Sequence, residues 1–310
     1  MPPARKRGGR APARDSAARS RGAGTKKKSG RAPTTTRSRR LGRLLAIGGR
    51  EERSASGEIL QHLVELAGGA GRAHVLICSG AMDDGHDALR EYQRVFEALG
   101  AATTTEPLFE RPRGNSDVLL ERLERATAVF FTGGDQLQLT AMMAGTRFGE
   151  GIRSRLQTRG LVVAGTSAGA AAMSSTMIVG GPSDGSVRRA DVDLAPGLGY
   201  WREALIDTHF SERGRVNRLL TLLAENPQIL GIGLDEDTAV AVTPGRSFRV
   251  LGSGVTTVFD GRVQYTNAAE VEREESLALF DVRLHVLPRG YGFDLVRRMP
   301  QHPAPRAGRV

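Results

Sequence analysis

The sequence predicts an α/β fold: a doubly wound, mostly parallel sheet with helices on both faces and antiparallel hairpins toward the C-terminus. Strand-like and helix-like segments alternate at least five times between residues 44 and 164, with short connections, which is typical of a parallel sheet. Apolar and polar residues alternate over 248–265 around glycines and an Asp-Gly pair, which favours hairpins.

Capping signals support the predicted elements up to residue 164. Ser116 is expected to cap one helix at its N-terminus, and Gly100 is expected to close another at its C-terminus. The strands are expected at 44–47, 74–78, 101–105, 128–132 and 161–164, and the helices at 59–67, 87–99, 116–125, 137–144 and 149–158.

The alternation loosens in the second half of the chain. A stretch rich in Gly, Pro and Asp over 177–199 is expected to be a loop. After it we expect a strand at 205–207, a helix at 215–224, and strands at 229–234 and 238–242. No internal repeat is found, so one α/β domain is predicted over 41–298, with a flexible tail over 299–310.

The charge is distributed unevenly. Residues 1–40 carry a net charge of +13, which leaves −3 for the rest of a chain whose total is +10. Because this segment has almost nothing to bury, it is predicted to be a disordered basic tail. A possible function is salt-sensitive contact with a polyanion such as a nucleic acid, although a solvated extension without a specific role is favoured.

Other features of the composition bear on the compartment. A single cysteine, Cys78, argues against a disulfide scaffold and suits a reducing compartment. No apolar run approaches the ~20 residues of a membrane span, and the basic N-terminus lacks the apolar segment of a secretory signal. A cytoplasmic protein without membrane contact is therefore expected.

Ser167 lies in Gly165-x-Ser167-x-Gly169, between a predicted buried strand and an Ala-rich segment. This pattern is that of a nucleophile elbow, in which small neighbours let a sharp strand-to-helix turn expose the serine. The backbone amide of Ala168 would then stabilise an oxyanion. The paired glycines 133 and 134 follow another strand end, so the Gly134 amide is expected as the second donor.

Two further segments are expected at the same edge of the sheet, outside the carboxyl ends of the strands. The first carries His209, the natural base for a serine nucleophile, followed by Arg213, Arg215 and Arg218, which suggest an anionic substrate. The second carries the acids 235–237, one of which would orient the imidazole; spacing alone does not rank them. No metal or other cofactor is expected, because no cluster with metal-ligand spacing is evident.

These ordered motifs resemble those of the cyanophycinases, serine peptidases related to dipeptidase E and, in fold, to class I glutamine amidotransferases. The resemblance covers about 41–290 and includes Gly133-Gly134-Asp135-Gln136, the serine elbow, the histidine segment with its arginines, and Gly231 to Ala239. It implies an exopeptidase that hydrolyses cyanophycin, a polyaspartate with arginine on each β-carboxyl, to β-Asp-Arg dipeptides through an acyl-enzyme.

The resemblance also assigns roles to individual residues. It implies that Ser167 is the nucleophile, His209 the base and Glu236 the residue that orients it, with Gln136 and the three arginines in contact with substrate. It also implies a homodimer. Two alternatives remain: a dipeptidase E-like or isoaspartyl peptidase with the same triad, and a nucleic-acid-associated binding protein in which the basic tail acts and the serine site is vestigial.

Overall fold

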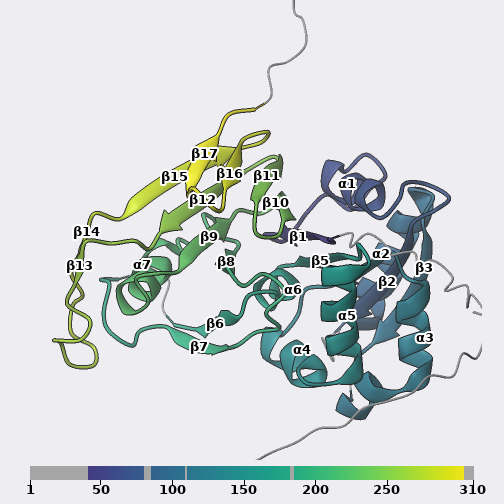
Figure 1. The fold of residues 1–310 in the computed structure, drawn as a ribbon, viewed down its shortest axis with the longest axis horizontal. Helices are drawn as coiled ribbons and strands as arrows, with labels where there is room; N and C mark the ends of the chain where they lie inside the picture. Colours follow the sequence, from purple (N-terminus) through teal and green to yellow (C-terminus); the bar gives the residue numbers. More distant parts are fainter. Residues whose placement is uncertain (1–40, 80–84, 109, 182–184, 304–310) are drawn as a thin grey trace, which may run out of the picture. The chain divides into compact units, whose positions relative to one another are not determined.

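The computed structural model describes residues 41–79, 85–108, 110–181 and 185–303, and Figure 1 shows how their helices and strands are arranged. The predicted basic tail over 1–40 and the end of the predicted C-terminal tail, 304–310, lie outside the described residues. The described residues belong to one compact unit.

The main sheet has nine strands in the order β17-β16-β11-β10-β1-β5-β4-β2-β3. Its parallel part consists of β1 (Arg43–Ile47), β5 (Val162–Thr166), β4 (Ala128–Phe131), β2 (His74–Ser79) and β3 (Ala102–Pro107). The other four strands continue it antiparallel from β1: β10 (Thr238–Thr243), β11 (Ser247–Gly252), β16 (Gly292–Asp294) and β17 (Met299–Gln301). The predicted mostly parallel sheet is confirmed.

Helices cover both faces of the parallel part, as predicted. Alternate residues of β1 enter different cores: Leu44 lies in one and Leu45 in the other. One core is packed by α3 (Asp117–Arg125), α4 (Gln136–Met143) and α5 (Arg147–Thr158), next to the short 3-10 helix η1 (Arg111–Asn115). The opposite core is packed by α1 (Glu58–Leu66) and α2 (Gly85–Ala98).

A second, four-stranded sheet lies beside the first and was not foreseen as a separate layer. Its order is β15 (Arg283–Pro288), β12 (Val255–Asp260), β9 (Leu230–Leu234) and β8 (Ala204–Thr208). β8 and β9 run parallel to each other, whereas β12 is antiparallel to both of its neighbours, β9 and β15. Helix α7 (Val216–Glu225) lies beside this sheet (Figure 1). It contributes buried leucines to the core on the sheet.

Two sequence-based boundaries differ from the structure. The expected loop over 177–199 contains an antiparallel pair, β6 (Thr176–Gly180) and β7 (Asp193–Pro196), because buried Met177 and Ile178 form a strand before the Gly- and Pro-rich stretch. The expected flexible tail from 299 begins with β17, which is hydrogen-bonded to β16. A short pair, β13 (Tyr265–Thr266) and β14 (Leu279–Phe280), completes the strands.

Candidate active site

Ser167 stands at a sharp turn between β5 and the single-turn helix α6 (Ala168–Ala171). Its backbone has φ 52° and ψ −115°, a conformation that side chains with a Cβ rarely adopt. A Cβ on Gly165 would lie 2.4 Å from the carbonyl carbon of Gly169, and one on Gly169 would lie 2.5 Å from the carbonyl oxygen of Phe131. The helix therefore approaches β5 and β4 closely only because both positions are glycine.

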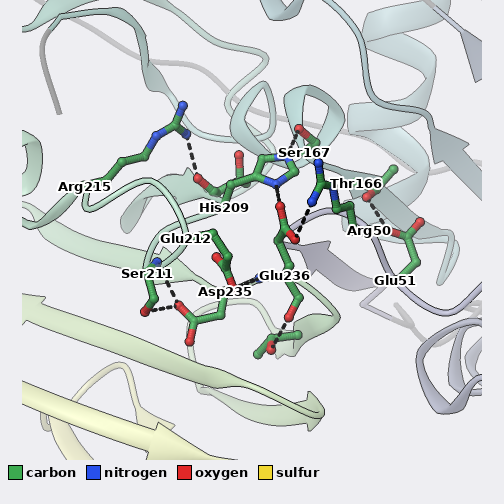
Figure 2. A network of polar contacts seen from close by, with 12 residues as sticks. Arg50, Glu51, Thr166, Ser167, His209, Ser211, Glu212, Arg215, Asp235 and Glu236 are labelled. Atoms are coloured by element: carbon green, nitrogen blue, oxygen red, sulfur yellow. Dashed lines mark hydrogen bonds and ion pairs between the residues drawn. The ribbon is translucent and has the colours of Figure 1, made fainter.

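A chain of hydrogen bonds starts at this serine (Figure 2). Ser167 Oγ lies 2.8 Å from Nε2 of His209, and Nδ1 of the same ring lies 2.8 Å from Oε1 of Glu236. His209 follows the end of β8, and Glu236 follows the end of β9. The carboxyl ends of parallel strands in two different sheets thus meet, and a serine, an imidazole and a carboxylate lie within hydrogen-bonding distance.

The three consecutive acids point to three different partners. The carboxylate of Asp235 accepts hydrogen bonds from the backbone amide and the hydroxyl of Ser211, at 3.1 and 2.6 Å. Asp237 accepts one from the backbone amide of Glu52, at 3.0 Å. Glu236 alone contacts the imidazole, so geometry distinguishes the acids that spacing could not.

The surroundings of Glu236 favour its charged form. Its second oxygen, Oε2, lies 3.2 Å from a guanidinium nitrogen of Arg50. Burial by itself raises the pKa of Glu236, but the hydrogen bond from His209 and the charge of Arg50 outweigh it and lower this pKa below its ordinary value. The carboxylate is thereby kept as an acceptor beside the imidazole.

A polar cavity of about 300 Å³ opens beside the serine. Its lining includes the three residues Gly134, Gln136 and Ala168, the serine and histidine, Asp207, and the arginines 213, 215 and 218. Two larger cavities, of about 600 and 610 Å³, are lined by other residues and contain neither the serine nor the histidine. Size alone therefore does not mark the candidate site, whereas the chemistry of its lining does.

The arginines of this cavity differ in their contacts. Arg215 and Arg218 lie 3.0 and 3.5 Å from the two oxygens of buried Asp207. Burial raises the pKa of Asp207, against the opposing charges of Arg218 and Arg215. Within the described part of the chain, no carboxylate pairs with Arg213. The cavity therefore keeps positive charge for an anionic group.

The remaining expected residues lie at the same cavity. Gln136 begins α4 and donates from Nε2 to the carbonyl oxygen of Ile178, at 3.1 Å. Ala168 follows the serine directly, and Gly134, with φ 138°, follows β4. Among the described residues, neither of these two backbone amides donates a hydrogen bond, so both donors are available.

Two contributors were missed by the sequence analysis. Gly49, which follows the strand predicted at 44–47, has φ +109°, and a Cβ there would lie 2.3 Å from Cε1 of His209. Glu51 is buried beside Thr166, the residue before the serine (Figure 2). The signal for Gly49 was available, because a glycine pair ends a central strand here just as it does at 133–134. Nothing local marks Glu51.

The described residues contain neither a metal-binding cluster nor a membrane-spanning helix. No group of three or more His, Cys, Asp or Glu side chains in this part of the chain could hold a metal ion. None of its helices is both long and apolar enough to cross a membrane.

Comparisons with known proteins agree on a family. The model of peptidase family S51 matches residues 44–250. A cyanophycinase from Geminocystis herdmanii is 39% identical over 259 residues, covering 83% of this chain and 95% of the relative. One from Trichormus variabilis is 38% identical over 257 residues, covering 82% and 86%. The crystal structure of a peptidase from an acI-B1 Actinobacterium shares the fold, with a TM-score of 0.61, 20% identity and coverage of 82% and 97%.

Proposed function

The chain belongs to peptidase family S51, and we propose that this peptidase is a serine-type exopeptidase that hydrolyses cyanophycin to β-Asp-Arg dipeptides. The observation that carries the proposal is the hydrogen-bonded series Ser167, His209 and Glu236 at the rim of an arginine-lined cavity. Relatives named cyanophycinase, at 36–39% identity over most of the chain, support the substrate.

The proposed reaction begins with general-base catalysis. His209 Nε2 takes the proton of Ser167 as Oγ attacks the carbonyl carbon of a backbone peptide bond. The imidazolium then gives this proton to the leaving amine, and the C–N bond breaks to leave an acyl-enzyme. A water molecule, deprotonated by the same ring, attacks the ester and releases the carboxylate product together with the free serine. Glu236 stabilises the imidazolium in both halves.

The negative oxygen of each tetrahedral intermediate is assigned to two backbone amides, those of Ala168 and Gly134. Backbone donors that are held in place before the reaction stabilise developing charge without reorganising. The absence of other acceptors for these amides within the described residues supports this role. No side chain is required for it, which is why small residues suffice at both positions.

The charges of the cavity fit the proposed substrate. Each arginine branch of cyanophycin ends in a free carboxylate, which Arg213, Arg215 and Arg218 would bind, with Gln136 as a further contact. Asp207 pairs with two of these arginines, Arg215 and Arg218, and so holds their guanidinium groups at the cavity. An isoaspartyl or dipeptidase E-like activity would need fewer cations, so the arginine-rich cavity favours the polymer-derived substrate.

Assembly, location and the basic tail are further parts of the proposal. A homodimer is proposed from the family resemblance, and a cytoplasmic location from the single cysteine. Contact of residues 1–40 with a polyanion is proposed from their net charge of +13. Salt-dependent retention of the full chain on immobilised DNA, compared with a chain lacking residues 1–40, tests this contact separately from catalysis.

Release of β-Asp-Arg from purified insoluble cyanophycin tests the central proposal. The unaltered chain should release soluble dipeptide, and Ser167→Ala should release essentially none while unfolding at the same temperature. Release by Ser167→Ala at the normal rate would refute the assignment of the nucleophile. If the unaltered chain releases nothing, the substrate is wrong, and a panel of α- and β-aspartyl dipeptides becomes the next test.

A further inference from the structure

Glu51 is a buried carboxylate that the proposed mechanism does not use. Only 3% of its surface is exposed, and it receives one hydroxyl donor on each oxygen. Tyr92 of α2 donates to Oε1, and Thr166 at the end of β5 donates to Oε2 at 2.6 Å. Burial and the charge of Glu51 raise the pKa of Tyr92, so the phenol stays a donor. A carboxylate is costly to bury, so both donors hold it strongly in place.

The segment that carries Glu51 touches all three parts of the proposed triad. We call residues 48–52, which follow β1, loop 48–52. The carbonyl oxygen of Ile47, just before it, accepts from the backbone amide of Ser167 at 2.9 Å. Within the loop, the carbonyl oxygen of Gly48 accepts from the amide of His209 at 2.9 Å. That of Gly49 accepts from the amide next to Glu236, at residue 237, at 2.8 Å.

These contacts connect segments that are far apart in the chain. The serine, histidine and acid segments come from the ends of three strands in two sheets, and the backbone carbonyl oxygens of residues 47–49 bond to all three segments. Loop 48–52 is itself irregular, with positive φ at both Gly49 and Arg50, so regular pairing does not hold it. Its buried side-chain anchor is Glu51, bonded to the residue that precedes the nucleophile.

We propose that Glu51 is a positioning residue: it anchors loop 48–52 and thereby keeps Ser167 in line with its base. This inference rests on the proposed serine mechanism, but not on the identity of the substrate. An error of about 1 Å in the placement of a reacting group costs roughly a hundredfold in rate. Loosening the anchor should therefore slow the chemical step without altering the arginine-lined cavity that binds substrate.

Glu51→Gln and Thr166→Val probe this anchor in the full-length chain. The glutamine keeps the size of the side chain but replaces one acceptor by a donor, and the valine removes one hydroxyl. Each should lower kcat by about 10- to 100-fold and leave KM within about twofold. Because both remove the same interaction, the double variant should lose little more than either single one.

Thr146→Val is the matched control for a purely structural role. Thr146 is also buried, and its hydroxyl donates to the Met143 carbonyl and accepts from the Gly149 amide, neither of which lines the cavity. It should lower the melting temperature but not kcat. The inference is overturned if Glu51→Gln retains normal kcat, if the losses multiply in the double variant, or if Thr146→Val with an equal loss of stability slows turnover equally.

A fluorophosphonate separates this inference from the substrate assignment. It labels an activated serine by forming a bond between Oγ and phosphorus with loss of fluoride, and the labelled peptide is identified by mass. The unaltered chain should be labelled at Ser167. In Glu51→Gln, the rate of labelling should be lower by about tenfold or more. If the unaltered chain is labelled faster than Glu51→Gln but releases no dipeptide, the substrate assignment is refuted and the role of Glu51 is supported. No labelling of the unaltered chain would overturn both.

Discussion

Gly49→Ala tests the geometry around His209 most directly. A Cβ at this position would lie 2.3 Å from Cε1 and 2.6 Å from Nε2 of the imidazole, whereas ordinary contacts begin near 3.4 Å. The ring must therefore move by about 1 Å, which breaks its 2.8 Å hydrogen bond to Ser167. We expect kcat to fall about a hundredfold or more, with little change in KM because the arginines are untouched.

The backbone of Gly49 makes a control necessary, since alanine at φ +109° is strained by about 1–3 kcal/mol whatever the space around it. Gly71→Ala provides the match: Gly71 has φ +75°, and a Cβ there would meet nothing within 4 Å. Both variants are compared by thermal unfolding and by dipeptide release under saturating substrate. A folded Gly49→Ala chain with normal kcat would refute the reasoning, as would an equal loss of kcat in Gly71→Ala.

The contacts of the site lead to four other predictions. Glu236→Gln should lower kcat by about a thousandfold and Asp237→Asn by far less, as measured by dipeptide release; the reverse order would move the orienting role to Asp237. Folding lowers the pKa of Glu236 below 4.5, so the charged Glu236 carboxylate stabilises the folded state above pH 4.5. This contribution is lost as the pH falls through the folded-state pKa. In urea unfolding, the difference in free energy of unfolding between Glu236→Gln and the unaltered chain should therefore become smaller below pH 4.5. Asp207→Asn should lower the free energy of unfolding in urea by about 3 kcal/mol, since it leaves the guanidinium groups of buried Arg218 and half-buried Arg215 without their counter-charge; unchanged stability would contradict this pairing. Arg213→Gln should raise KM about tenfold without lowering the melting temperature, because no carboxylate in the described part of the chain pairs with it; a drop in stability with normal KM would refute a binding role.

The elbow was predictable because its causes are local. Gly165 and Gly169 lie two residues on either side of Ser167. A Cβ at either position would come within 2.5 Å of backbone atoms, which is the crowding that the pattern implies. The alternation of strands and helices likewise follows from periodicity, which fixes which residues of β1 face which core. The Gly- and Pro-rich stretch misled the prediction over 177–199, because its apolar first residues pair with a strand 13 or more residues later.

The amino-acid sequence by itself determined the α/β class, the serine elbow, and the set of candidate side chains, since these depend on neighbours within a few residues. Only the tertiary structure decided which of the three acids faces His209, because beyond the end of a strand each side chain follows the path of its loop. It also brought Glu51 to Thr166, 115 residues away in the chain, and set Gly49 against the imidazole. Contacts of this kind depend on how two sheets meet at their edges, and no local pattern of residues encodes that meeting.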